Sequence, residues 1–258
     1  LDGAPKVAVL LAAYNGRAFI EEQLQSILQQ ENIAISIFIS VDLSSDGTYE
    51  WCCDFSDIES RITVLTYGEK FGGAAPNFYR LIREVDFSGF DYVALSDQDD
   101  IWLEDKLFTA VNAIKYNKVQ GYSSNVIAFW ENGRKYIIDK AQAQRKYDYL
   151  FEAAGPGCTY VLTVKPLTEF KKCLVTHKQL VNQITLHDWL LYAFFRAQGY
   201  RWLIDDNSKM RYRQHPSNQV GVNKGLKAYL KRFELLKSGW YRQQIKNISL
   251  FIQMESPI

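Results

Sequence analysis

Two apolar segments near the start of the chain constrain the fold more than any other feature. Val7–Ala12 is a continuous apolar run, and Ile35–Val41 is a second run rich in β-branched residues. Such strands are buried on both faces, as is typical of a parallel sheet covered by helices. Between them, apolar residues recur at helical spacing from about Arg17 to Gln30, so these segments predict one βαβ unit.

The next residues continue this alternation. We expect a third strand over Arg61–Tyr67, a helix over Asn77–Glu84 and a fourth strand over Tyr92–Ser96. This order predicts an α/β fold with a Rossmann-like, mostly parallel sheet flanked by helices. Further on, residues 112–122 and 131–147 are polar and predict a helix and connecting loops, whereas residues 158–164 predict a strand and residues 186–196 a helix.

Ligands of such sheets bind beyond the carboxyl ends of the strands. Polar clusters follow three of these ends, at Tyr14–Gly16, Asp42–Thr48 and Asp97–Asp100. The last cluster holds three carboxyl groups in four residues, and their mutual repulsion is costly unless a cation neutralises them. Oxygen ligands at this density suit Mg²⁺ or Mn²⁺ shared with a diphosphate, with an acidic surface turn as the alternative.

Several segments, in order, resemble glycosyltransferase family 2, which has the GT-A fold. VLLAAYNG at 9–16 resembles its first strand and donor-binding turn, and DLSSDGT at 42–48 resembles its second nucleotide-binding loop. YVALSDQDDIWLEDKL at 92–107 resembles its DXD segment. HDWLL at 187–191 and YRQHPSNQVG at 212–221 resemble the rhamnosyltransferase-like branch.

This resemblance implies an inverting, metal-dependent glycosyltransferase that moves a sugar from a nucleoside diphosphate donor to a hydroxyl group. The acceptor would be a glycan or a lipid-linked molecule in surface polysaccharide synthesis. Rhamnose from dTDP-rhamnose is the first expectation for the donor, because the HDW and RQH segments resemble rhamnosyltransferases.

The resemblance also implies roles for individual residues. Asp99 would ligate the metal, with His215 as an additional ligand, and Asp188 would be the catalytic base. The donor would contact the following residues: Ala13, Tyr14, Asn15, Asp42 at the base, Lys70, Asp97 at the ribose or the metal's waters, and Arg213 at the diphosphate. The structural alternatives are a helix cap for Asp188, a hydrogen-bond donor for His215 and a surface ion pair for Arg213.

Two positions depart from the family pattern. The second loop often carries two adjacent acids, whereas Val41 occupies the first position here. Many relatives have asparagine before the glycines of the third loop, where this chain has Lys70 within Gly68–Gly73. We expect that lysine either to contact the diphosphate or to reflect a different donor.

Two alternative functions stay open at this point. A haloacid dehalogenase-like phosphatase also has DxD after a strand, but that motif normally follows the first strand and is followed by threonine or valine rather than by Ile101-Trp102. A carbohydrate-binding protein without turnover could share the fold. A dinucleotide enzyme is disfavoured, because no GxGxxG follows Val7–Ala12.

Charge divides the chain into two parts. The net charge is only +1, which argues against a nucleic-acid partner, but residues 209–258 hold ten bases and two acids. We expect a transferase domain over residues 1–221 and a basic amphipathic helical segment over residues 222–258. Its apolar residues are Leu226, Tyr229, Leu230, Phe233, Leu236, Trp240, Tyr241 and Phe251. They predict either packing on the domain or peripheral contact with an anionic membrane.

Cysteine usage and hydropathy indicate the compartment. The four cysteines show no CxxC spacing, so we expect free thiols. The run Val7–Ala13 is too short for a membrane span. We therefore expect a cytoplasmic protein that is soluble or peripheral at the inner face of the cell membrane.

Overall fold

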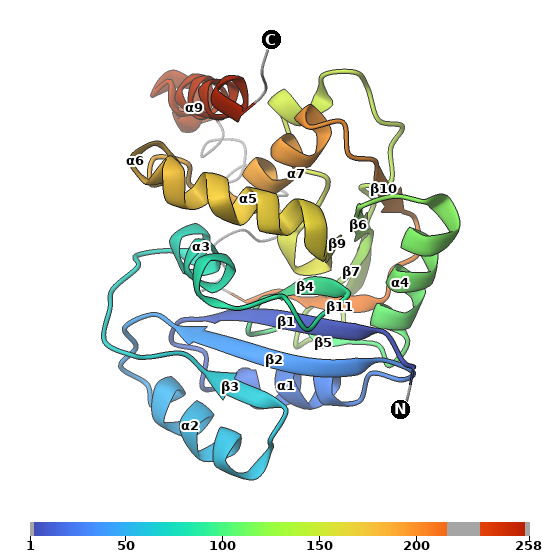
Figure 1. Ribbon diagram of the computed structural model, residues 1–258. Coiled ribbons are helices and arrows are strands. Elements are labelled where there is room, and N and C mark those ends of the chain that lie inside the picture. Colours follow the sequence, from blue (N-terminus) through green and yellow to red (C-terminus); the bar gives the residue numbers. More distant parts are fainter. Residues whose placement is uncertain (1–2, 216–232, 256–258) are drawn as a thin grey trace.

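The computed structural model describes residues 3–215 and 233–255 (Figure 1). A seven-stranded sheet with helices on both faces forms its centre, which confirms the expected α/β architecture. In spatial order, its strands are β10 (Trp202–Asp205), β6 (Gly121–Ser124), β9 (Val161–Thr163), β4 (Tyr92–Ser96), β1 (Lys6–Ala13), β2 (Ala34–Val41) and β3 (Ile62–Val64).

The sheet is mostly parallel, as expected. Strand β9 runs antiparallel to its two neighbours β4 and β6, whereas the other adjacent pairs are parallel. Alternate residues of β1 enter different cores: Ala8 and Leu10 pack on one side of the sheet, and Val7 and Val9 on the other. This two-sided burial explains why the strand is continuously apolar in sequence.

Helices cover both faces of the sheet (Figure 1). One face carries α3 (Ala74–Glu84), α5 (Val164–Thr176) and α7 (His187–Ala197). The other face carries α1 (Ile20–Leu28), α2 (Thr48–Ile58) and α4 (Lys106–Asn117). Shorter helical elements among the described residues include α6 (Lys178–Val181) and the 3-10 turns η1 (Asp148–Leu150) and η2 (Gly157–Thr159).

A second, four-stranded sheet brings the later part of the chain back to the acidic cluster. Its order is β5 (Ile101–Trp102), β11 (Met210–Arg213), β7 (Val126–Phe129) and β8 (Lys135–Ile138). Strand β5 directly follows Asp100 and pairs antiparallel with β11, where Trp102 lies opposite Met210. This pairing places the residues after β11 beside the acids after β4.

Part of the expected secondary structure was wrong. Residues 112–122 and 131–147 were expected to form a helix and loops. The helix is present as α4, although it begins earlier, at Lys106, whereas strands β6 and β8 replace part of the expected loops and β7 lies between the two segments. Each of these strands has only four residues. Strand β8 pairs with the neighbouring β7, whereas β6 and β7 also pair with β10 and β11, about eighty residues later. Such long-range pairing leaves little local pattern to read. In the expected strand over residues 158–164, the turn η2 takes the first residues and β9 the last.

The described C-terminal part packs on the main domain. In helix α9 (Trp240–Glu255), Ile248 and Phe251 are fully buried in the core under α5 and α7. The Phe251 ring centroid lies 6.1 Å from that of Phe170. Of the two interpretations of the C-terminal segment, these residues therefore agree with packing on the domain. The expected boundary at residues 221 and 222, and the apolar residues Leu226, Tyr229 and Leu230, lie outside the described residues.

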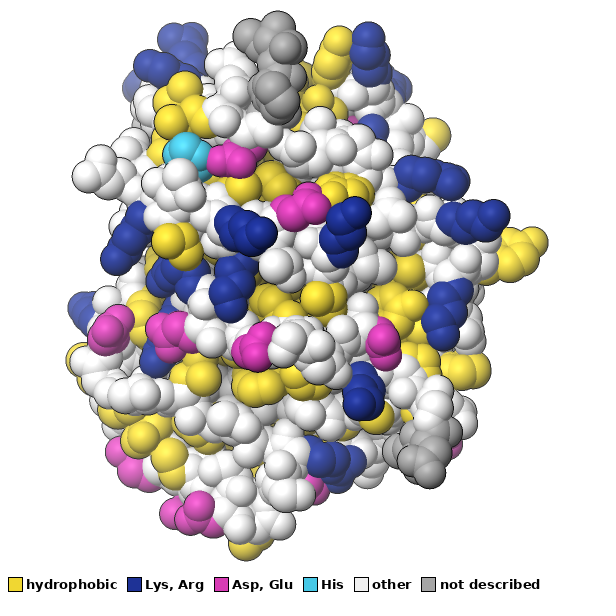
Figure 2. All heavy atoms as spheres, in the orientation of Figure 1, with side chains coloured by type: hydrophobic (Ala, Val, Ile, Leu, Met, Phe, Trp, Pro, Cys, Tyr) yellow, Lys and Arg dark blue, Asp and Glu magenta, His cyan; other side chains and the backbone are white. Residues whose placement is uncertain are grey.

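The described surface carries charges of both signs. Basic and acidic side chains are interspersed over the face shown in Figure 2, in keeping with the near-neutral net charge. None of the described helices combines the length and the apolarity that crossing a membrane requires. All four cysteines are free thiols, as expected.

Candidate active site

The loops after β1 and β2 are joined by hydrogen bonds. The amide of Asn15 donates to Ser44 Oγ at 3.0 Å, and the amide of Ser45 donates to Asn15 Oδ1 at 2.9 Å. Asn15 has a φ of 44°, a conformation that asparagine adopts more readily than most residues. The amide of Gly16 donates to Thr48 Oγ1 at 2.9 Å. The two loops therefore form one rigid edge, and Asn15 lies within it.

Gln98 connects this edge to the acidic cluster. The amide of Tyr14 donates to Gln98 Oε1 at 2.7 Å, and Gln98 Nε2 donates to the Tyr14 carbonyl at 2.8 Å. A Cβ atom on Gly16 would lie 2.1 Å from Gln98 Oε1, so a side chain there would displace Gln98 from this position. The side chain of Tyr14 is half exposed at this edge.

Asp42 holds the third loop. Its Oδ1 accepts hydrogen bonds from the amides of Leu43 and Phe71, both at 2.7 Å, and its Oδ2 accepts one from Gly72 at 2.8 Å. The structure thus shows a scaffolding role for this buried carboxylate, and contact with the base stays a prediction. The Ala13 carbonyl accepts a hydrogen bond from the Asp42 amide at 2.8 Å. Lys70 lies exposed in the loop that Asp42 anchors.

Burial and mutual repulsion disfavour the ionised forms of Asp97 and Asp100 in the acidic cluster. Burial, followed by the charges of Asp99 and Asp188, raises the pKa of Asp97 to about 7. Burial and the neighbouring acids raise the pKa of Asp100 well above its ordinary value. Asp100 Oδ2 is buried and finds no hydrogen-bond partner among the described residues. Carboxyl groups in this condition fit a divalent cation, whose charge would offset their repulsion.

Cys158, which the sequence predicts only as a free thiol, joins this group of acids. Its Sγ and carboxylate oxygens of Asp97 and Asp100 lie within 4.8 Å of one another. Cys158 is fully buried in the turn η2, and burial together with the charges of these acids raises the pKa of its thiol. Sequence spacing offered no signal, because Cys158 stands almost sixty residues after the acids.

His215 and Asp99, the two residues predicted to ligate a metal, lie together. His215 Nε2 is 2.7 Å from Asp99 Oδ2, and the imidazole stacks on the Phe19 ring with centroids 4.7 Å apart. Imidazole and carboxylate groups are both common metal ligands. The geometry is therefore compatible with the predicted pair, while metal ligation itself stays a prediction.

Arg213 is committed to the scaffold of the acidic turn. Its Nε donates to the Asp99 carbonyl at 2.8 Å, its amide donates to Asp100 Oδ1 at 3.2 Å, and its guanidinium pairs with Glu22. The guanidinium also lies 5.1 Å and 4.7 Å from the ring centroids of Phe19 and Phe129. The alternative of an ion pair is thus confirmed, and contact with a diphosphate stays a prediction.

Asp188 lies in the first turn of α7, beside the acidic cluster. The Trp189 amide donates to Asp188 Oδ1 at 2.8 Å. Burial raises the pKa of Asp188 to about 6, against the opposing effects of backbone N–H groups and the Lys140 charge. At neutral pH such a carboxylate is mostly ionised and can accept a proton near pH 6 to 7. Asp188 packs beside Gly157, the neighbour of Cys158, and its charge contributes to the raised pKa of Asp97.

The start of α7 packs tightly against the turn η2. The buried imidazole of His187 stacks on Phe78 with centroids 4.1 Å apart, and burial lowers its pKa to about 3. A Cβ atom on Gly157 would lie 2.6 Å from His187 Nε2 and 3.2 Å from Asp188 Cβ. Gly157 therefore allows the close approach that positions Asp188.

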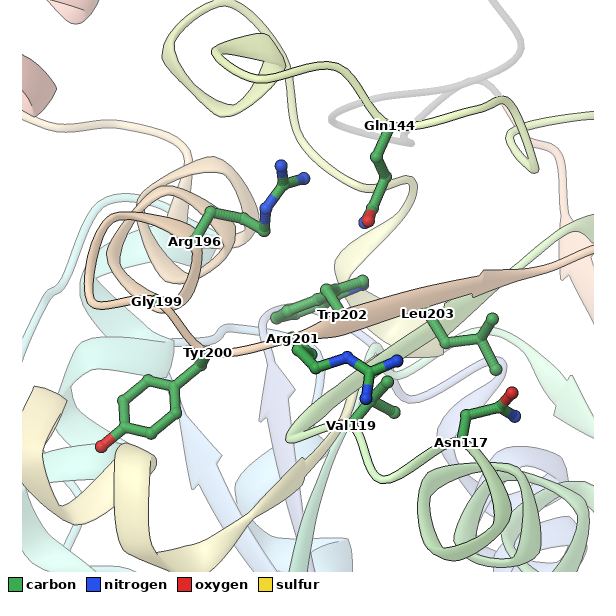
Figure 3. A pocket seen from close by; sticks show the side chains of 9 residues that line it. All are labelled: Asn117, Val119, Gln144, Arg196, Gly199, Tyr200, Arg201, Trp202 and Leu203. Carbon is green, nitrogen blue, oxygen red and sulfur yellow. The ribbon is translucent and has the colours of Figure 1, made fainter.

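A separate pocket lies at the opposite edge of the sheet (Figure 3). It has a volume of about 420 Å³ and is formed around the amino ends of β6 and β10, where Trp202 and Arg201 stand, rather than around their carboxyl ends. One of its cations, Arg196, pairs with Asp148 at 3.1 Å. The acids after β4 are at the other edge, so this pocket is separate from the candidate active site.

The comparison with known families decides the assignment. The family model of glycosyl transferase family 2 matches residues 8–162, which include β1, β2, β4 and the acidic cluster. The chain belongs to this family. It is also 50% identical, over 93% of its length and 83% of the relative's, to the dTDP-rhamnosyl transferase RfbG of Shigella flexneri. The enzyme is therefore a glycosyltransferase.

Solved structures agree on the fold. Staphylococcus aureus TarS 1–349 in complex with UDP-GlcNAc matches with a TM-score of 0.59 and 15% identity, over 84% of this chain and 62% of that one. The mannosyltransferase PcManGT from Pyrobaculum calidifontis, in complex with GDP-Man and Mn²⁺, matches with a TM-score of 0.58 and 14% identity, over 98% and 76%. The fold is thus GT-A, and the phosphatase and the non-catalytic binding protein are not supported.

The contact between Gly157 and α7 gives a first prediction. In Gly157→Ala, the added methyl group must displace the stacked His187 and with it Asp188. We expect turnover to fall roughly ten- to a hundred-fold, since small misplacements of a reacting group cost that much. We also expect a loss of about 1–3 kcal/mol in the free energy of unfolding, the usual cost of overpacking. Steady-state kinetics and denaturant unfolding measure the two effects.

Gly89→Ala is the matched control, because a Cβ atom there meets nothing within 4 Å. Equal behaviour of the two variants would contradict the assigned packing.

Proposed function

We propose that this glycosyltransferase moves rhamnose from dTDP-rhamnose to a hydroxyl group of a glycan or lipid-linked acceptor, in the synthesis of a surface polysaccharide. The observation that carries the proposal is the 50% identity to a dTDP-rhamnosyl transferase across nearly the whole chain. A second relative, 27% identical over 67% of this chain, is a glucosyltransferase of Escherichia coli whose name specifies a diphosphoundecaprenol acceptor. That relative supports a lipid-linked acceptor.

The donor would lie along the edge formed by the first two loops. Tyr14 offers an exposed ring beside the backbone of Ala13 and Asn15, which are held in place by the second loop and Gln98. Asp42 would act at the base from its position in the second loop, and Lys70 would reach the diphosphate from the loop that Asp42 anchors. Arg213 would contribute to the binding of the diphosphate by holding the acidic turn in place.

The acidic cluster would hold Mg²⁺ or Mn²⁺. Asp99 and His215 are the ligands that we propose, with Asp97 at the ribose or at the metal's waters. The buried, unpartnered oxygen of Asp100 and the raised pKa of Asp97 support a cation at this place. When bound, a divalent cation supplies positive charge to the leaving diphosphate.

Asp188 would be the catalytic base of a single displacement. The acceptor hydroxyl would lose its proton to this carboxylate as its oxygen attacks the anomeric carbon, and the bond from that carbon to the diphosphate would break. Attack from the side opposite the leaving group inverts the anomeric configuration. The raised pKa of Asp188 supports this role, because it makes the carboxylate a stronger proton acceptor than an exposed aspartate.

A donor panel tests the proposed substrate and the metal together. We expect slow, metal-dependent release of dTDP from dTDP-rhamnose with water as the acceptor, and much slower release from dTDP-glucose, UDP-galactose and GDP-mannose. Chelation by EDTA and the variant Asp99→Asn should each lower the rate at least roughly 100-fold, because transition-state charge is no longer neutralised. Chromatography of the released nucleotide measures the rates.

The exposed Asp57 on α2 gives the control variant Asp57→Asn, which should behave as wild type. Preference for another donor would refute the assigned substrate, and full activity in EDTA would refute the metal.

A second prediction concerns the base. Asp188→Asn should lower the turnover rate by about 10²–10⁴-fold while donor affinity is unchanged, because the amide accepts no proton. In the wild type, Asp188 becomes protonated as pH falls through about 6, so the turnover rate should fall with it on the acid side. Isothermal titration and pH-dependent kinetics measure these effects. A product with retained anomeric configuration in its NMR spectrum would exclude the single displacement.

We further propose that the enzyme works in the cytoplasm, in peripheral contact with an anionic membrane through its C-terminal segment. Although the buried face of α9 packs on the domain, Arg242, Lys246, Leu250 and Met254 are exposed at intervals of four residues. Such spacing places bases and apolar side chains on neighbouring parts of one helix surface.

Liposome sedimentation tests this contact. The full chain should sediment with anionic liposomes at low salt and less at high salt, because salt screens the bases. Replacing Leu250 and Met254 by serine should weaken the binding, whereas the same change at the exposed Ile58 of α2 should not. Failure of the intact protein to bind at low salt would show that the segment has another role.

A further inference from the structure

Helix α9 buries two amide side chains next to its apolar contacts. Gln244 is 3% exposed and Asn247 is 4% exposed, and they stand three residues apart on the face that packs against the domain. Buried amides are costly unless hydrogen bonds satisfy them. The hydrogen-bond partners of these two side chains therefore show what this face of the helix holds in place in addition to its apolar packing.

Both amides bind the backbone of the segment that leads into α7. Gln244 Oε1 accepts a hydrogen bond from the Thr185 amide, and Gln244 Nε2 donates to the Gln183 carbonyl, both at 3.0 Å. Asn247 Nδ2 donates to the same carbonyl at 3.4 Å. Gln244 thus donates and accepts at once, as a neighbouring strand would. Neither an apolar nor a carboxylate side chain can do both.

The segment held in this way has no regular secondary structure. Residues 184–186 lie between the end of α6 and the start of α7, two to four residues before Asp188. On the other side, Tyr79 of α3 donates a hydrogen bond from its hydroxyl to the Ile184 carbonyl at 3.3 Å. Side chains from α3 and α9, rather than a strand ladder, therefore hold the backbone that leads into α7.

The position of α9 is itself fixed at its far end. Glu255 accepts a hydrogen bond from the Cys173 thiol at 2.9 Å and lies 2.5 Å from His177 Nε2, while its carbonyl accepts one from Gln198 at 3.1 Å. Between the two ends, Phe251 is fully buried against α5 and α7. With its C-terminal end and Phe251 held, the helix presents Gln244 at a defined place.

We propose that Gln244, assisted by Asn247, is a positioning residue that directs the Asp188 carboxylate toward the acceptor hydroxyl. The inference rests on the proposed function, in which Asp188 is the base. Gln244 touches no reacting group, and it acts through the backbone at residues 183–185. Helix α9 also lies outside residues 8–162, the part matched by the family model, so this support belongs to the C-terminal part of the chain.

The variant Gln244→Met tests this role, because it keeps the length of the side chain and removes both hydrogen bonds. With dTDP-rhamnose as donor and water as acceptor, we expect kcat to fall roughly ten- to a hundred-fold, while KM for the donor changes less than about twofold. Gln253→Met makes the same substitution at an exposed position of the same helix and should behave as wild type.

A second readout separates positioning from a general loss of structure. In an Asp188→Asn background, Gln244→Met should change the remaining turnover less than about twofold, since its effect passes through the missing carboxylate. A merely structural effect would lower turnover equally in both backgrounds. If Gln244→Met does not fold, Asn247→Leu is the second test variant, because it removes the Asn247 bond to the Gln183 carbonyl and leaves both Gln244 bonds in place.

The outcomes are distinguishable. Wild-type turnover in Asp188→Asn would refute the proposed base, whatever Gln244 does. Loss of turnover in Asp188→Asn, combined with wild-type kcat in Gln244→Met or with fully additive effects, would leave the base in place and overturn the positioning role alone.

Discussion

Mutual repulsion among the carboxyl groups after β4 is the constraint around which the site is arranged. Asp97, Asp99 and Asp100 stand within four residues at the end of a fully buried strand, and burial adds to the cost of their charge. The surrounding groups offset part of this cost: the Arg213 amide bonds to Asp100, and His215 lies against Asp99. A cation shared with a diphosphate would offset the rest, which links the stability of this turn to ligand binding.

Much of the polar chemistry at this edge of the sheet holds the loops in place. Asp42 binds three backbone amides, Gln98 binds both backbone groups of Tyr14, and Arg213 joins the acidic turn to Glu22 on α1. These contacts connect loops that follow different strands. A donor would therefore meet a surface that is already organised, so that less conformational freedom is lost on binding.

The two parts of the chain supply different elements of the candidate site. The part matched by the family model supplies the first two loops and the acidic cluster, whereas the residues after it supply α7 with Asp188, the return strand β11 and helix α9. Asp188 lies near Asp97 because α7 packs on the turn η2 through Gly157. The position of Asp188, the candidate base, thus depends on packing between elements that are distant in sequence.

The sequence by itself determined the parts of the fold that have a strong local pattern. The continuous apolar runs predicted β1 and β2, the period of about 3.6 residues predicted α1, and the acids after Tyr92–Ser96 marked the candidate metal site. Only the tertiary structure decided the pairing of the four-residue strands β6 with β10 and β7 with β11, the pairing of Arg213 with Glu22 and the contacts of Gln244 with the segment before Asp188. The reason is physical. Periodicity records which side of an element is buried, whereas these pairings join residues from about sixty to about 190 positions apart, whose proximity follows from how the helices pack on the sheet.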